Sequence, residues 1–337
     1  MLSKFKKIFG KGKQNKAKEQ QLNCDEVVSS TDSSASHEGA ETVRQARELT
    51  LSFISGLLGV RALETDESAV QASQMRALLD AELIGLSEDS IPKLSNDAIV
   101  LFKVMMDPEV GFKQLDEAIS KDPGLAGKVI SMANSPAYLS ADIEIASLEH
   151  AISMLGTARL KHVVMSALVS DQFDIECNYF RSFGKALWEH SGEVANNARK
   201  LAERGGGDPS LAYFCGLIHD IGKLIIFKKL VELFSQQKEE PHPVVFSALL
   251  NDYSDALTRR ACEVWELPDR WCQPVYEFQI SEFDAMNNPD AIALYQANIF
   301  AELNALFAAG EITEFELVWR LQSAGSTVEE FREFYPL

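Results

Sequence analysis

The chain has 337 residues, of which 46% are hydrophobic, so it can bury a substantial core in one large domain or two smaller ones. Its net charge is −18 overall and +6 within residues 1–20, which leaves −24 for the rest. Because a body this acidic repels phosphate backbones, we expect no nucleic-acid partner. The five cysteines form no CxxC pair, which argues against a zinc ribbon or disulfide framework and favours a reducing cytoplasm.

The first 20 residues form a basic segment whose four apolar residues recur at helical spacing: Leu2, Phe5, Ile8 and Phe9. Two interpretations stay open, a solvated disordered tail or a short helix in weak contact with an anionic membrane surface. Residues 21–40 are rich in serine, which predicts a flexible linker, so we expect residues 1–40 to be disordered. No apolar run approaches the ~18–20 residues of a membrane-spanning helix, and no secretory signal follows the basic start.

Helical periodicity begins near residue 41 and continues along the chain, whereas strand alternation is nearly absent. The sequence therefore predicts an all-α fold. Asp122-Pro123 and Asp208-Pro209 each combine an N-cap acceptor with proline at the first helical position, so each is expected to begin a helix. The predicted divisions are a tail and linker at 1–40, a helical N-terminal extension at 41–87, a central domain at 88–300 and a C-terminal helical extension at 301–337.

The strongest chemical signal is the stretch Leu217-Ile218-His219-Asp220-Ile221-Gly222-Lys223. An adjacent His and Asp offer a neutral nitrogen and an anionic oxygen to a metal ion. Lys223 follows Asp220 by one helical turn, so it can reach the same side and hold a phosphate. His190, from an upstream helix, could supply another ligand. The structural alternative is a histidine that packs or caps within a helix bundle, with Asp220 paired to Lys223.

Several flanking motifs, taken with this stretch, resemble the HDOD domain, the HD-related output domain of bacterial signalling proteins. The resemblance covers residues 88–300 and implies an all-α, multi-helix bundle of HD-like shape. It also implies a signalling output or scaffold that acts on other signalling proteins, usually without demonstrated catalysis. The motifs are Ile91-Pro92-Lys93-Leu94, Asp122-Pro123-Gly124-Leu125-Ala126, Asn134-Ser135-Pro136-Ala137-Tyr138, Ser147-Leu148-Glu149-His150-Ala151-Ile152, Leu155-Gly156 and Trp265-Glu266-Leu267-Pro268.

The chain departs from catalytic relatives at the later ligand positions. Those relatives have one histidine before the WxLP element, a His-His pair after it, and a late aspartate. The matching positions here are Ser254, Phe278, Gln279 and Asn298. A shift of the alignment by one residue restores no histidine, because none follows His242.

The remaining ligands are too few for a di-metal centre, which needs about five or six His and Asp ligands. Three candidates, His190, His219 and Asp220, could hold one divalent ion weakly. We therefore expect no catalytic residues, no required cofactor, and a cytoplasmic pseudo-enzyme that acts as a non-catalytic signalling scaffold. The alternatives are a mononuclear metal-dependent phosphohydrolase and a nucleotide-binding sensor. All three hypotheses involve the same His-Asp site, defined as His190, His219, Asp220 and Lys223.

Other reactive or bulky side chains receive structural interpretations. His150 and His162 fit surface or hydrogen-bonded helix positions, and Cys215 fits a buried apolar position. His242 lies in a loop from which it could approach the site, and His37 carries no signal. The apolar C-terminal stretch is expected to dock on the domain, with a partner surface as the alternative. Four aromatic residues are expected to pack between helices: Trp265, Trp271, Tyr276 and Phe278.

Deletion of residues 1–40 is expected to leave folding intact, because a tail without an apolar core contributes little to stability. The melting temperatures of the full and shortened chains, followed by circular dichroism, should agree within about 2 °C. A large fall in the shortened chain would show that these residues pack on the domain.

Overall fold

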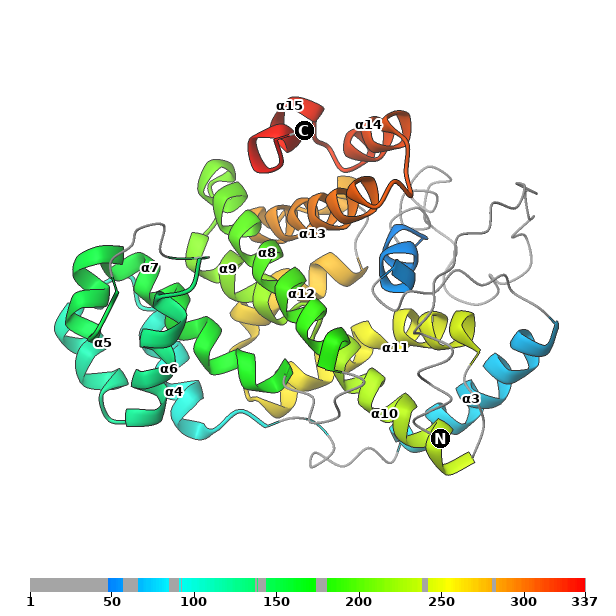
Figure 1. Ribbon diagram of the computed structural model, residues 1–337, viewed down its shortest axis with the longest axis horizontal. Helices are drawn as coiled ribbons and strands as arrows, with labels where there is room; N and C mark the ends of the chain where they lie inside the picture. The colour runs from blue at the N-terminus through cyan, green and yellow to red at the C-terminus, as the bar shows by residue number, and fades with distance from the viewer. Residues whose placement is uncertain are drawn as a thin grey trace.

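The computed structural model describes residues 48–56, 66–84, 91, 93–136, 138, 144–173, 181–237, 242–280 and 283–336. The predicted tail, linker and membrane contact, and His37, lie outside these residues. Within them the chain forms helices and no strand, which confirms the all-α prediction (Figure 1). The predicted domain boundaries stay predictions.

A helical segment at 48–56 precedes the labelled helices. The α-helices that follow are α3 (Asp66–Ile84), α4 (Asn96–Met105), α5 (Phe112–Ile119), α6 (Pro123–Ala133), α7 (Leu148–Ser170), α8 (Arg181–Gly205), α9 (Pro209–Ile218), α10 (Ile221–Gln237), α11 (Pro243–Val264), α12 (Asp269–Ile280), α13 (Pro289–Ala308), α14 (Glu314–Ser323) and α15 (Val328–Phe334). Helices α4 to α7 gather at one end of the molecule, and α8, α9, α12 and α13 form its centre (Figure 1).

The helix starts follow the predicted capping signals. The Asp122 carboxylate accepts hydrogen bonds from the amides of Gly124 (2.9 Å) and Leu125 (3.1 Å), and Pro123 is the first residue of α6. Asp208 caps α9 in the same way. Each cap satisfies amide donors that have no partner within the helix, which fixes where the helix begins.

Helix α7 consists of two helical segments, one on either side of Gly156. That glycine has φ +74°, a conformation that residues with a Cβ rarely adopt, and it kinks the helix. Gly156 therefore marks a break between two helical segments and not a turn of one straight helix.

The centre of the fold is built on close contact between α8 and its neighbours α9 and α13. Gly216 in α9 faces the α8 backbone so closely that a Cβ there would lie 2.4 Å from the Cα of Ala195. The absence of a side chain at Gly216 thus lets α9 approach α8, and this approach brings the end of α9 beside His190.

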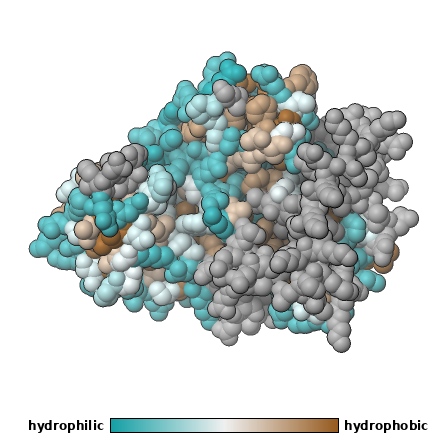
Figure 2. All heavy atoms as spheres, in the orientation of Figure 1, coloured by the Kyte–Doolittle hydropathy of each residue, from teal (hydrophilic) through white to brown (hydrophobic). Residues whose placement is uncertain are grey.

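The C-terminal helices dock on the central helices, as expected from their apolar residues. Phe331 is fully buried, and its ring lies edge-on to that of Phe300 at 5.5 Å. The Tyr335 hydroxyl donates to Glu193 on α8. On the outer side of α14, however, Phe315 is 80% exposed and Trp319 is 41% exposed, so apolar residues gather at the surface there (Figure 2).

Two stretches, Leu148–Phe173 and Pro209–Gln237, are long and apolar enough to cross a membrane when judged by mean hydropathy rather than by uninterrupted runs. The prediction that no apolar run approaches the length of a membrane-spanning helix therefore needs correction when mean hydropathy is the criterion. Other parts of the fold bury 56% of the first window and 89% of the second. Core helices of a folded domain pass the same test, so the evidence for membrane spans is weak.

A matched pair of glycine substitutions tests the contact between α8 and α9. Gly216→Ala should destabilise the fold by about 1–3 kcal/mol or more, because the added methyl overlaps the α8 backbone. Gly192→Ala, within α8, meets no atom within 4 Å and should stabilise by about 0.5–1 kcal/mol. Urea denaturation of both variants measures the difference, and equal stabilities would contradict the close packing.

Candidate functional site

The His-Asp pair lies in the turn between α9 and α10. His219 is the C-cap of α9, and Asp220 precedes the first residue of α10. Thr258 on α11 fixes this turn from outside: its hydroxyl donates to the His219 carbonyl (3.1 Å) and accepts from the Gly222 amide (3.0 Å). Three helices therefore set the position of the two side chains.

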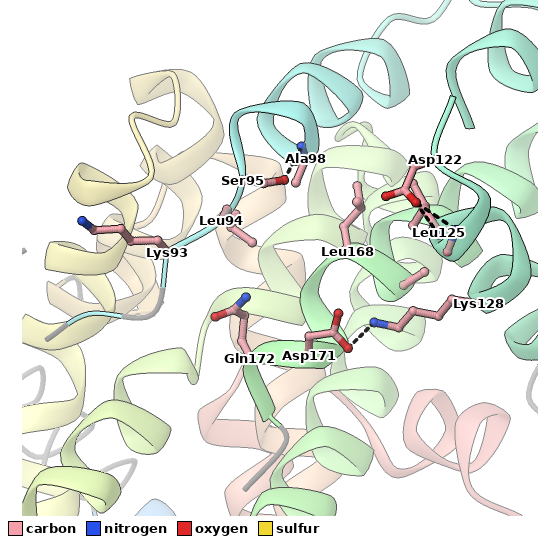
Figure 3. Close-up of a pocket in the computed structure, with 12 residues that line it drawn as sticks. Lys93, Leu94, Ser95, Ala98, Asp122, Leu125, Lys128, Leu168, Asp171 and Gln172 are labelled. Atoms are coloured by element: carbon pink, nitrogen blue, oxygen red, sulfur yellow. Dashed lines mark hydrogen bonds and ion pairs between the residues drawn. The ribbon is translucent and has the colours of Figure 1, made fainter. Parts of the chain in front are cut away.

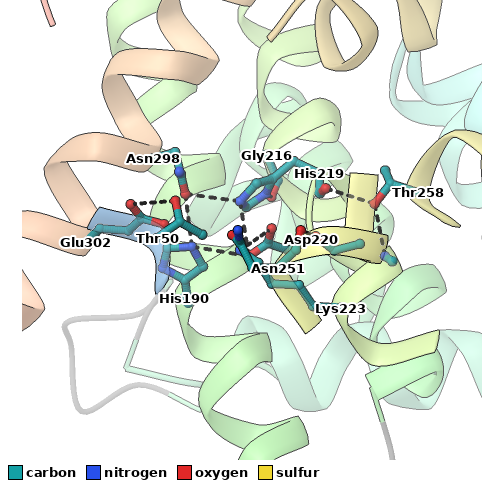
Figure 4. Close-up of polar contacts among 12 residues, drawn as sticks. Thr50, His190, Gly216, His219, Asp220, Lys223, Asn251, Thr258, Asn298 and Glu302 are labelled. Atoms are coloured by element: carbon teal, nitrogen blue, oxygen red, sulfur yellow. Dashed lines mark hydrogen bonds and ion pairs between the residues drawn. The ribbon is translucent and has the colours of Figure 1, made fainter. Parts of the chain in front are cut away.

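The structure brings the three predicted metal ligands together. His190 Nε2 lies 3.5 Å and His219 Nε2 lies 3.4 Å from Asp220 Oδ2, and the ligand atoms of all three residues lie within 4.8 Å of one another. Each of the three side chains is buried. Figure 4 shows His190 on α8 and Asn298 on α13 facing His219 and Asp220.

Lys223 also belongs to this cluster. Its Nζ lies 2.7 Å from the Asp220 carboxylate, and both residues are no more than 5% exposed. Burial alone would raise the pKa of Asp220, but its interactions with His219 and the Lys223 ammonium outweigh burial and hold that pKa at about 2. The carboxylate is thus ionised, and its charge is already balanced by a protein cation.

Hydrogen bonding determines which nitrogen of His219 carries the proton. Nδ1 lies 2.8 Å from the Gly216 carbonyl oxygen, an acceptor, so the proton is on Nδ1. Burial lowers the pKa of His219 and lowers that of His190 to about 3, so both rings are neutral near pH 7. The lone pair on His219 Nε2 then points into the cluster, as in an imidazole that binds a metal.

Asn298, at the position where we expect catalytic relatives to have an aspartate, lies between the two imidazoles. Its Oδ1 is 3.1 Å from His190 Nε2 and 3.2 Å from His219 Nε2. As an oxygen ligand it would complete a site for one divalent cation with His190, His219 and Asp220. With the amide turned, its nitrogen would instead donate to the His219 lone pair. Either way the amide adds no negative charge, so the cluster fits at most a weakly held ion.

Glu302 is the site residue that sequence reasoning missed. It lies four residues after Asn298 on α13 and is fully buried. Thr50 Oγ1 donates to its Oε2 at 3.2 Å, while Oε1 has no hydrogen-bond partner among the described residues. Burial raises the pKa of Glu302 to about 7. An acid one helical turn after Asn298, on a mostly apolar helix, was the available signal.

The predicted positions of the missing histidines differ in their relation to the site. The Phe278 ring stands edge-on to His219, with centroids 6.1 Å apart, so an apolar ring borders the cluster where relatives place histidine. Ser254 instead hydrogen-bonds the Asn251 carbonyl at 3.4 Å. Gln279 has two buried amide atoms without hydrogen-bond partners among the described residues.

The other candidates lie away from the clustered ligands. His242 occupies the N-cap position of α11 without a side-chain capping hydrogen bond, and Cys215 donates from Sγ to the Trp271 carbonyl at 3.3 Å. Burial raises the pKa of the Cys215 thiol, as expected for an inert buried cysteine. The prediction that His162 lies at the surface or is hydrogen-bonded needs correction. Its ring stacks on that of Tyr213 with centroids 4.3 Å apart, yet its Nε2 has no hydrogen-bond partner within the described residues. Stacking and packing, rather than hydrogen bonds, hold this ring.

A hollow of about 450 Å³ lies elsewhere, between the starts of α4 and α6 and the end of α7 (Figure 3). Two of its charged residues are paired, with Lys128 Nζ 2.5 Å from Asp171. The Asp122 carboxylate at its edge is used to cap α6. None of the His-Asp site residues lines this hollow, so it offers that site no entrance.

Comparison with known proteins gives a match to the HDOD domain over residues 91–279, which is more than half of the chain. A Treponema pallidum protein of uncharacterised function is 23% identical over 193 residues, 54% of this chain and 36% of that protein. Ribonuclease Y of Helicobacter pylori is 40% identical over 79 residues, 21% of this chain and 14% of the enzyme. The chain thus spans well under two thirds of the length of these relatives.

Solved structures show the same fold at low identity. A Shewanella amazonensis protein, whose name assigns it provisionally to the phosphohydrolases, has a TM-score of 0.55 and 20% identity, covering 74% of this chain and 91% of its own. A Geobacter sulfurreducens HDOD domain protein of unknown function has a TM-score of 0.50 and 20% identity, covering 87% and 93%. Segment 48–56, Asn298 and Glu302 all lie outside the matched range 91–279.

The raised pKa of Glu302 predicts a pH-dependent loss of stability. A carboxyl group that holds its proton more tightly when folded stabilises the fold below its unfolded pKa of 4.5 and loses that contribution as the pH rises through about 7. Glu302→Gln should therefore match the wild type at about pH 4 and exceed its unfolding free energy by up to about 3 kcal/mol at pH 8.5. The exposed Glu109→Gln is the control. Equal pH profiles for wild type and Glu302→Gln would contradict the assignment.

Proposed function

Because the chain belongs to the HDOD domain family, we propose that it is a non-catalytic signal-transduction output protein that acts through contacts with other signalling proteins. One observation carries this proposal: the Asp220 carboxylate, the acidic member of the three convergent ligands, is ion-paired to Lys223 at 2.7 Å. A divalent cation would have to compete with this ammonium for the same oxygens. The site is therefore better suited to hold the core together than to activate water.

The neighbouring residues support the same proposal. Asn298 is neutral, and Phe278 is apolar, at positions where catalytic relatives have ligands. A hydrolase that cleaves phosphodiesters through paired metals needs ligands for both ions and a bridging group. In this chain the described groups suffice for one ion at most. We therefore propose a pseudo-enzyme in a cytoplasmic setting, consistent with the free thiols of Cys215, Cys262 and Cys272 among the described residues.

Nucleic acid is not a partner under this proposal. Ribonuclease Y is named for RNA cleavage, but the likeness covers only 21% of this chain. The residues beyond position 20 carry a net charge of −24, which repels phosphate backbones at long range.

The second candidate is a mononuclear metal-dependent phosphohydrolase. The convergence of His190, His219 and Asp220 within 4.8 Å and the protonation of His219 on Nδ1 favour it. A bound divalent cation would supply Lewis acidity and lower the pKa of a water molecule. In this chain His190 and His219 would hold the ion, and Lys223 would have to leave Asp220 to neutralise a phosphate.

Metal content and turnover separate the two candidates. The purified full chain should carry well under one equivalent of Mn, Fe or Zn and should not cleave cyclic dinucleotides or bis-aryl phosphates. Asp220→Ala should then change stability but no activity. Stoichiometric metal together with turnover that disappears in Asp220→Ala, and persists in the surface control Asp252→Ala, would establish the hydrolase instead.

A further inference from the structure

The helical segment at 48–56 lies directly against the His-Asp site. The Phe53 ring packs on the His190 ring with centroids 4.5 Å apart. Three residues before it, Thr50 donates from Oγ1 to Glu302 at 3.2 Å. Figure 4 shows Thr50 beside both Glu302 and His190, so this segment meets the site from the side of α13 and α8.

One face of the segment is built for this contact. Leu49, Phe53 and Ile54 are between 1% and 4% exposed, whereas Glu48 and Ser52 are exposed. The buried residues recur at helical spacing, so a single apolar stripe faces the domain. The segment is therefore an amphipathic helix that docks on the domain, not an irregular connection that only passes the site.

When this helix is docked, its apolar side chains cover the polar His-Asp site. His190, His219 and Asp220 are 5%, 2% and 5% exposed, although their ligand atoms converge as in a site that takes an ion. A ring against His190 keeps water and ions from that side of the cluster. The cover lies outside the HDOD match, which begins at residue 91, so it is an addition to the matched domain.

We expect the cover to be held more weakly than the helices it covers. Among the described residues its attachment rests on three buried apolar side chains and the Thr50 bond, and a helix depends on such tertiary contacts for most of its stability in water. Helices α8 and α13 are much longer and are packed against each other along the centre of the fold. A peripheral element with few buried contacts opens at a lower free energy than the core.

We propose that segment 48–56 is an intrachain plug that shuts the His-Asp site, and that its displacement opens His190 and His219 to ions and small molecules from solvent. The plug opens and closes as a unit while α8, α9 and α13 stay folded. This concerns access to the site and goes beyond the proposed function, since it holds whether or not the opened site turns over a substrate.

Hydrogen–deuterium exchange of the full wild-type chain tests the opening directly. The amides of 48–56 should exchange together and at least about tenfold faster than those in the middle of α8 and α13. Protection of 48–56 equal to that of α8 and α13 would overturn the plug, because the segment would then be part of the core.

Histidine modification by diethyl pyrocarbonate tests access. In Phe53→Ala the rate of modification at His190 and His219 should rise at least about tenfold over wild type, since truncation of a buried aromatic weakens the docked helix. His162, 7% exposed and remote from the plug, is the internal control and should not change. Ser52→Ala, on the exposed face of the same helix, is the matched variant and should behave as wild type.

The outcomes are distinct. No increase at His190 and His219, or an equal increase at His162, would overturn the proposal, the second because it reports loosening of the whole domain. Thr50→Val, which removes the bond to Glu302 without changing side-chain size, gives a milder opening if Phe53→Ala does not fold. Neither measurement depends on turnover, so their failure would leave the proposed function standing.

Discussion

The ion pair between Lys223 and Asp220 is the interaction on which the polar centre depends. Both charges are almost completely buried, and a buried charge is tolerated only with a close partner. Loss of either partner would leave the other uncompensated, at a cost of about 3–5 kcal/mol. The pair also fixes the chemistry of the cluster: Asp220 stays ionised, and the carboxylate that a cation would need is already engaged.

The missing charge of the Asn298 amide decides how strongly this site attracts a divalent ion. With an aspartate at position 298 the cluster would carry two carboxylates against one ammonium, a net attraction for a divalent ion. With Asn298 the nearest charges balance. The extra acid on α13, Glu302, is mostly neutral below pH 7, because burial raises its pKa. The arrangement is therefore a polar core whose groups satisfy one another more than it is a trap for cations.

Local signals were sufficient to predict much of this architecture. The caps at Asp122 and Asp208 depend on neighbours within a few residues, so sequence spacing reveals them. The His-Asp pair and Lys223 also share one helical turn. Glu302 offered only one local signal, its spacing from Asn298, because its partner Thr50 is 252 residues distant in the chain. The stacking of His162 on Tyr213 similarly joins α7 and α9, whose packing the sequence does not reveal.

The plug gives the site a means of communication even without catalysis. A closed helix and an open helix are two states of one element, and any molecule that binds only the open state shifts the equilibrium toward it. By thermodynamic linkage the effect is reciprocal: a partner that captures the apolar face of Phe53 exposes His190, and a ligand on the exposed site frees that apolar face for the partner. A site that keeps Asp220 but has Asn298 and Phe278 in place of further ligands can thus still couple a small ligand to a protein contact, as the proposed signalling function requires.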